Sequence, residues 1–110
     1  MPARRSGLGL VLAFLSLAGT ATKGHALAIC VDSKVLAIQQ SECVSRASAV
    51  MNKYFEQTQH DTGAVFGFQG KDSAAAILCD QAAKGVVFFS AASTDESVCR
   101  QNILRLKNDF

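Results

Sequence analysis

The chain has 110 residues, which is enough for one domain. Its eleven basic and nine acidic residues give a formal net charge of +2, but three of the basic residues, Arg4, Arg5 and Lys23, lie near the N-terminus. Without these three, eight basic residues stand against nine acidic ones, and the net charge of the remaining chain is close to −1. This charge argues against a protein that binds nucleic acid.

The N-terminal segment has the pattern of a secretory signal peptide. Arg4 and Arg5 precede a continuous apolar run over residues 8–18. This run is too short to span a bilayer, which takes about 20 residues, but it suits the apolar centre of a signal peptide. Small residues follow it, and we expect cleavage after Ala26 or Ala28.

Two alternatives concern the same segment. It could remain as an uncleaved membrane anchor, although its apolar run is short. Residues 27–30 also have some likeness to a lipoprotein cleavage motif, but Ile29 stands before Cys30 where a small residue is expected. We therefore predict a cleaved signal peptide over residues 1–26 and a single small domain over residues 27–110. The mature domain would be periplasmic or secreted, without contact to the membrane.

Two short apolar runs open the predicted mature domain, at residues 27–31 and 34–39. One or both should be strands, and the second is the better candidate because it leads into a helix signal. Ser41 suits an N-cap, and the first helix is expected to end near Glu56. At helical spacing, one apolar stripe contains Cys43, Val44, Ala47, Val50, Met51, Tyr54 and Phe55.

The middle of the chain predicts a hairpin followed by a buried strand. Residues 57–63 are polar and end in glycine, which indicates a loop. Residues 64–68 alternate with period two, and a turn at residues 70–73 connects them to a partner strand at residues 74–79. Residues 86–89 are all β-branched or aromatic, which is typical of a strand inside a sheet and buried on both faces.

A second helix follows the buried strand. Ser93 and Glu96 have the spacing of a capping box, and the helix is expected to end near Asn108. Its apolar stripe contains Cys99, Ile103, Leu106 and Phe110. The order β-α-β-β-β-α predicts an α+β fold, with an antiparallel sheet of about four strands and two helices packed on one face.

Four cysteines lie in the predicted mature domain. An even number in a small exported domain indicates disulfide bonds, and a domain of this size needs them because its core is small. Cys43, Cys79 and Cys99 face the core side of their elements, so a bridge from strand to helix is reasonable. Of the three possible pairings we favour Cys43 with Cys79 and Cys30 with Cys99.

Three segments carry a resemblance to known proteins. They are Cys43-Val44-x-Arg46-Ala47, Ala75-Ala76-Ile77-x-Cys79 and the run at residues 85–89. Together they resemble a set of small exported bacterial proteins of unknown function, over roughly residues 36–110. The resemblance implies export and the order of strands and helices, and it implies no activity.

One sheet face is expected to be apolar although no helix covers it. If the helices cover the face that carries Phe66, Phe68, Ala75 and Ile77, the opposite face is not polar, as a solvated face should be. The interface candidates on that face are Val65, Ala74, Ala76 and Leu78, with two of residues 86–89. Such a surface marks an interface with another protein, unless residues 27–39 fold over it.

The residues that could carry chemistry are few. His60 lies beside Asp61 in the predicted loop, but the other histidine, His25, is removed with the signal peptide. The cysteines are 13, 36 and 20 residues apart, which fits neither a redox pair nor a four-cysteine zinc site. We predict no catalytic residue, no metal and no cofactor.

Three hypotheses for the function remain open. The first is a non-enzymatic module for protein interaction or self-association, with a protein partner or a second copy on the apolar face. The second is a small exported enzyme or thiol-active protein that uses His60 or a free cysteine. The third, ranked last because the core is small, is a binder of an apolar ligand between sheet and helices.

Overall fold

The structure is a computed structural model that describes residues 26–110. The predicted signal peptide, apart from Ala26, lies outside the described residues. The described part forms one antiparallel sheet of five strands with two long helices, which confirms the predicted α+β class. The elements follow the predicted order, with one strand more than the four expected.

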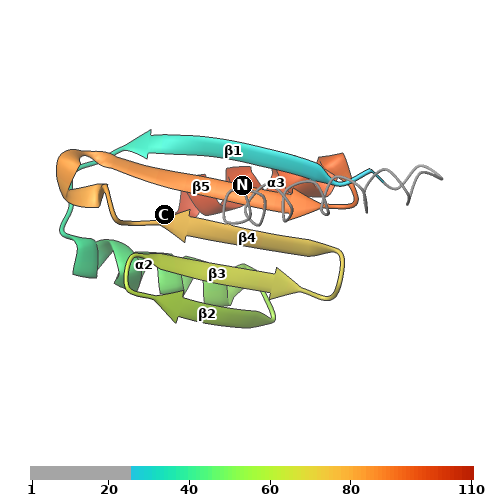
Figure 1. The fold of residues 1–110 in the computed structure, drawn as a ribbon, viewed down its shortest axis with the longest axis horizontal. Helices are drawn as coiled ribbons and strands as arrows, with labels where there is room; N and C mark the ends of the chain where they lie inside the picture. The colour runs from blue at the N-terminus through green and yellow to red at the C-terminus, as the bar shows by residue number, and fades with distance from the viewer. Residues whose placement is uncertain (1–25) are drawn as a thin grey trace, which may run out of the picture.

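All five strands lie side by side in one sheet (Figure 1). In sheet order they are β1 (Ala28–Val35), β5 (Val86–Ser93), β4 (Ser73–Leu78), β3 (Ala64–Gln69) and β2 (Gln57–Asp61). Strands β2 to β5 form a meander, and a short 3-10 helix, η1 (Ala82–Lys84), precedes β5. Strand β1 pairs with β5 and forms one edge of the sheet, whereas β2 forms the other edge. The chain therefore crosses from one edge of the sheet to the other between β1 and β2.

Strand β2 is the additional strand, and it lies in the segment that the sequence predicts as a loop. It pairs with β3 alone among the described strands, so it is an edge strand, and four of its five residues are exposed. An edge strand whose side chains are mostly exposed to solvent needs no apolar side chains and shows no alternation of hydrophobic residues. The polar composition of this segment was therefore a misleading signal.

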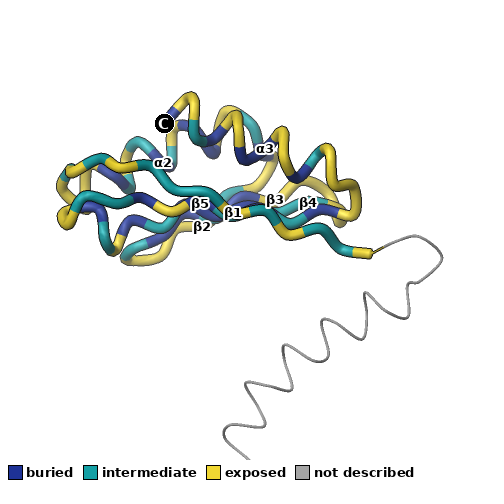
Figure 2. Tube along the Cα trace, turned by 90° about the horizontal axis from the view of Figure 1, so that it is seen from above, coloured by how far each residue is buried: buried dark blue, intermediate teal, exposed yellow. Residues whose placement is uncertain are grey.

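Both helices, α2 (Gln40–Tyr54) and α3 (Glu96–Asp109), lie on the same side of the sheet, as predicted (Figure 2). Their buried residues belong largely to the predicted stripes. In α2 these are Cys43, Ala47, Val50 and Met51, and in α3 they are Cys99, Asn102, Ile103 and Leu106. The core therefore lies between the helices and one face of the sheet.

The helix starts differ slightly from the prediction. Helix α2 begins one residue before Ser41, the predicted N-cap, and its actual N-cap makes no side-chain hydrogen bond. Helix α3 is capped by Asp95, whose carboxylate accepts the Ser97 backbone N–H at 2.9 Å. Ser93, the last residue of β5, instead accepts the Asp95 N–H at 3.1 Å, so it supports the cap from two residues earlier.

The first strand also differs from the preferred prediction. The sequence favours residues 34–39, but β1 covers mainly the first apolar run. The backbone N–H groups of Leu36 and Ile38 bind the carbonyl groups of Gly85 and Ala82, next to η1. These contacts lead the chain out of the sheet and toward α2.

Strand β5 lies inside the sheet, between β1 and β4, as predicted. Only one of its faces is buried, however. Val87 and Phe89 are 0% and 1% exposed, whereas Phe88 is 42% exposed. The prediction of two buried faces was wrong because both helices cover the same side, and no described residue covers the other (Figure 2).

The orientation of β3 is opposite to the predicted one, which changes the role of Val65. Val65 and Gly67 face the helices, and Phe66 and Phe68 lie on the other face. A methyl group at Gly67 would stand only 2.6 Å from the Met51 sulfur and 2.7 Å from the Phe55 ring. Because glycine lets α2 approach this closely, the glycine face of β3 is the buried one.

Candidate interaction surface

The face of the sheet opposite the helices carries apolar side chains on four strands. We call this surface the open face, and the strand register and the alternation of burial define it. Its residues are Ile29, Val31, Ser33 and Val35 in β1, Val86, Phe88, Ser90 and Ala92 in β5, Ala74, Ala76 and Leu78 in β4, and Ala64, Phe66 and Phe68 in β3. Two serines are its only polar residues, and none of its residues is charged.

Several of these apolar side chains are strongly exposed. Val35, Val31 and Ile29 in β1 are 87%, 74% and 62% exposed, and Phe68 is 36% exposed. The solvated face of an antiparallel sheet is normally polar, because hydrophobic side chains gain nothing from pointing into water. A contiguous apolar surface of this kind usually marks a site of association.

The structure separates the four predicted interface residues. Ala74, Ala76 and Leu78 lie on the open face, next to one another in β4. Val65 is 0% exposed and packs in the core, so its assignment to the interface was wrong. The error follows from the reversed orientation of β3.

Sequence reasoning missed the aromatic residues of β3 and all of the β1 contribution. A usable signal was present in β1, where Cys30 alternates with Ile29 and Val31. Once Cys30 is assigned to a bridge with a helix, its neighbours must point to the opposite face. The alternative that residues 27–39 cover the face does not hold, because β1 extends the sheet instead.

The open face is hollow in its middle at the end near the β3–β4 turn. There the central strands β4 and β5 carry small side chains, and the flanking strands β1 and β3 carry large ones. We call this hollow the trough. Two rows of paired residues form it: Ile29, Ala92, Ala74 and Phe68 in one, and Val31, Ser90, Ala76 and Phe66 in the next.

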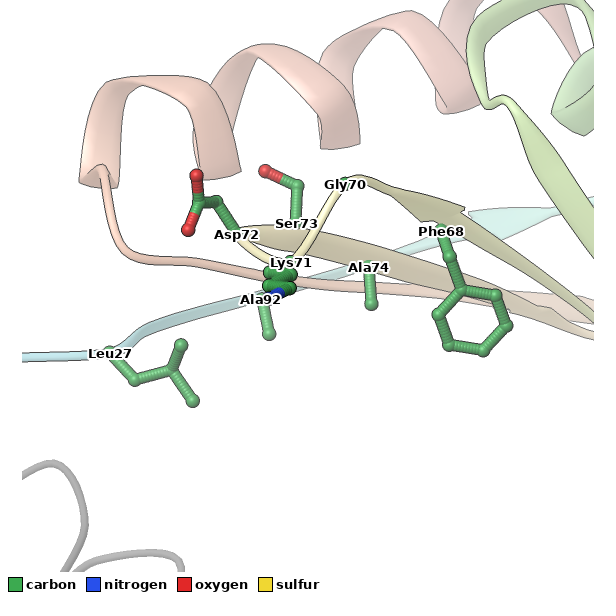
Figure 3. A pocket seen from close by; sticks show the side chains of 8 residues that line it. All are labelled: Leu27, Phe68, Gly70, Lys71, Asp72, Ser73, Ala74 and Ala92. Carbon is green, nitrogen blue, oxygen red and sulfur yellow. The ribbon is translucent and has the colours of Figure 1, made fainter.

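Two adjoining shallow depressions, of about 200 and 210 Å³, lie along the trough. Figure 3 shows the depression beside the β3–β4 turn, where the side chains of Leu27, Phe68, Ala74 and Ala92 point away from α3. Ser73, in contrast, points to the helix side. The trough is therefore lined by apolar groups and Ser90, and the charged residues Lys71 and Asp72 of the β3–β4 turn line only the depression at its end.

In the next row of the open face, the large side chains lie on the central strands and the small ones on the flanking strands. Phe88 in β5 and Leu78 in β4 stand side by side, flanked by the smaller Ser33 and Ala64. We call Phe88 and Leu78 the ridge. The same face thus carries an apolar projection next to an apolar hollow.

Charged contacts are concentrated on the helix side. The Lys107 ammonium donates to the Asp32 carboxylate at 3.2 Å, and the Ser33 backbone N–H together with Lys107 holds the pKa of Asp32 below its ordinary value of 3.8. Lys53 donates to Asp109 at 2.9 Å, and this carboxylate raises the pKa of Lys53 above its ordinary value of 10.5. The first ion pair joins α3 to β1 and the second joins α2 to α3, and none of these charged groups lies on the open face.

The two disulfide bonds also lie on the helix side. Cys30 in β1 is joined to Cys99 in α3, and Cys43 in α2 is joined to Cys79, just after β4, with Cα–Cα distances of 6.0 and 5.7 Å. These are the two pairs that the sequence analysis favours. All four cysteines are paired, so no thiol is left for the thiol-active alternative.

His60 lies on the edge strand β2 and contacts Ser48 of α2. The distance from its Nε2 to the Ser48 hydroxyl oxygen is 2.9 Å, which resembles the contact between a catalytic base and a nucleophile. The Ser48 hydroxyl has a single proton, and the Val44 carbonyl, at 2.8 Å from the hydroxyl oxygen, competes with His60 for it. In the tautomer with a proton on Nε2, His60 donates to Ser48 and does not act as its base.

Within residues 26–110, no group of three or more metal-binding side chains comes together. No helix in this part of the chain is long and apolar enough to cross a membrane. No protein-family model matches the chain, and no curated protein or solved structure is similar to it at a significant level. A proposal for the function must therefore start from the open face.

Proposed function

We propose that this chain is an exported, disulfide-stabilised, non-enzymatic module that binds a protein through the open face. The observation that carries the proposal is a four-stranded apolar surface without a charged residue. Removing apolar surface from water favours association. Beyond this face, the outward residues of β2 are Gln57, Gln59 and Asp61, which suit the polar rim of an interface.

Export is supported by two independent features. The sequence begins with the pattern of a signal peptide, and both cysteine pairs form disulfide bonds in the structure. Disulfide bonds persist in the periplasm and outside the cell, where thiols are not kept reduced. The resemblance to small exported bacterial proteins fits the same location.

The proposal is tested by photo-crosslinking in the compartment to which the protein is exported. A photoreactive phenylalanine analogue replaces Val31 on the open face or, as a matched control, Leu104 on α3. Both residues are apolar, and they are 74% and 56% exposed, so the analogue should not disturb the core. After illumination the protein is purified under denaturing conditions, and the mass of each adduct is measured.

We expect one protein adduct of defined mass from the Val31 position and none from the Leu104 position. Such a result identifies the open face as the binding surface and gives the mass of the partner. The proposal fails if the Val31 position yields no protein adduct. It also fails if both positions yield the same mixture, because the contact would then be unspecific.

A further inference from the structure

We infer that the partner of the open face is a second copy of this chain. The two copies would pack face to face, with the ridge of each copy in the trough of the other. This inference rests on the proposed function, because it names the occupant of the same surface. Three properties of the open face support it: its relief, its charge and its size.

The relief of the open face is self-complementary. A two-fold interface uses the same patch on both subunits, so a projection at one position needs a hollow at another position of the same patch. Here the ridge residues Phe88 and Leu78 adjoin a trough whose floor is Ala74, Ala76, Ser90 and Ala92. Both features lie on the same two strands, β4 and β5.

The required symmetry axis can be placed on the sheet. The axis lies parallel to the sheet and perpendicular to the strands, and it passes between the row of Phe88 and the row of Ser90. Rotation about this axis reverses the direction along each strand but keeps the order of the strands. It lays the ridge of one copy over the trough of the other and keeps β5 over β5 and β4 over β4. The result is a sandwich of two sheets, which pack about 10 Å apart in known proteins.

The charge of the open face permits contact with its own copy. Like charges that meet across an interface are unfavourable, and in a two-fold interface each charged group of a patch faces the same patch of the other copy. The open face carries no ionisable side chain, so its two copies meet without such repulsion.

The size of the open face is sufficient for a weak dimer. Four strands spaced by about 4.8 Å make it roughly 19 Å wide, and strands of six to eight residues make it about 20–26 Å long. Two such faces bury roughly 900 Å² or more, close to the ~1,000 Å² of a small specific interface. We therefore expect a dissociation constant in the micromolar range.

The first test measures the dissociation constant of the exported, purified protein by analytical ultracentrifugation. The variants are Phe88→Lys in the ridge and Leu104→Lys as a matched control on α3. Both residues are exposed, so circular dichroism and the mass of the oxidised chain should show that both variants fold. We expect the control to dimerise like the wild type and Phe88→Lys to dimerise at least 100-fold more weakly.

The second test asks whether ridge and trough meet. Ser90→Asp places a carboxylate in the trough, where it should also weaken the dimer because it faces Phe88 of the other copy. When the two variants are mixed, the new ammonium group of one copy lies over the new carboxylate of the other. We expect a heterodimer at least 10-fold tighter than either homodimer, a gain that a merely misfolded variant would not show.

Three results would overturn the inference. The wild-type protein could stay monomeric at all concentrations, with or without a bound apolar molecule. Phe88→Lys could leave the dimer unchanged, as pairing of two β1 edges would. The mixed variants could fail to associate. If the wild type is monomeric but the photoreactive residue at position 31 crosslinks to a protein of another mass, the proposed function stands. Only the inference that the partner is a second copy of this chain is then wrong.

Discussion

Gly67 shows how a single missing side chain decides which face of a strand is buried. Its place in β3 lies directly under α2, where Met51 and Phe55 occupy the space that a Cβ atom would need. The two phenylalanines of β3 would otherwise be the natural residues to bury, because large apolar side chains gain most from leaving water. They remain on the open face because α2 packs closely against the face of β3 that carries Gly67, and only a glycine leaves room for this contact.

Replacing Gly67 with alanine should destabilise the protein by about 1–3 kcal/mol, the usual cost of forcing a methyl group into a packed core. The measurement is urea unfolding followed by circular dichroism. A second variant, Met51→Ala, removes one of the clashing side chains. In its background the Gly67→Ala substitution should cost clearly less, since the two sites share one space. Additive costs would contradict the role assigned to Gly67.

At the scale of elements, β1 depends on contacts across the sheet and with α3. It pairs with β5 over its whole length, and its other edge pairs with no described strand. Its contacts with α3 include the Cys30–Cys99 bridge, the ion pair between Asp32 and Lys107, and a hydrogen bond from Lys34 Nζ to the Lys107 carbonyl at 3.2 Å. An exposed ion pair of this kind contributes little, so the disulfide bond is the stronger tie.

Replacing Cys30 and Cys99 together with alanine should lower the free energy of unfolding by about 2–4 kcal/mol. Amide hydrogen exchange should also become faster in β1 than in β4, because β1 can then open locally. The matched control replaces Cys43 and Cys79, which join α2 to the end of β4. That variant should also lose stability, but without selective opening of β1. Equal exchange in β1 and β4 after loss of the first bridge would contradict this account.

At the scale of the whole molecule, the protein has two layers and one uncovered side. Helices and sheet bury the core between them (Figure 2). Both disulfide bonds and the ion pairs Lys107–Asp32 and Lys53–Asp109 act within these layers. A second sheet on the open face would add a third and a fourth layer. Stability would then depend on the protein concentration, because association stabilises the folded state by mass action.

The melting temperature of the oxidised wild-type protein should therefore rise with concentration. Raising the concentration a hundredfold, from a tenth of the dissociation constant to ten times it, stabilises by about 1.4 kcal/mol. Because 1 kcal/mol shifts the melting temperature of a domain of this size by about 4–8 °C, the melting temperature should rise by roughly 5–11 °C. Leu104→Lys should behave likewise, and Phe88→Lys should melt at one temperature throughout. A constant melting temperature of the wild type would argue against association.

Three of the four predicted interface residues lie together on the open face, whereas Val65, whose placement depends on distant packing, does not. Ala74, Ala76 and Leu78 share a face because side chains alternate along one strand. Whether Val65 shares that face depends on the orientation of β3 against α2. The amino-acid pattern of β3 is compatible with either orientation, so the sequence does not place Val65. Phe88 likewise follows a buried-strand pattern, and only the placement of both helices on one side leaves it exposed.

The amino-acid sequence by itself determined the α+β class, the helical stripes and the hairpin turn, because each of these depends on periodicity or on residues close in the chain. The sequence favoured one of three cysteine pairings, but only the tertiary structure decided among them. The tertiary structure also decided that residues 57–61 pair as strand β2, that Val65 is buried, and that β1 extends the open face. These features depend on backbone pairing and on the close approach of α2 to Gly67. Such contacts join residues far apart in the chain, and local hydrophobic pattern does not encode which partner a segment meets.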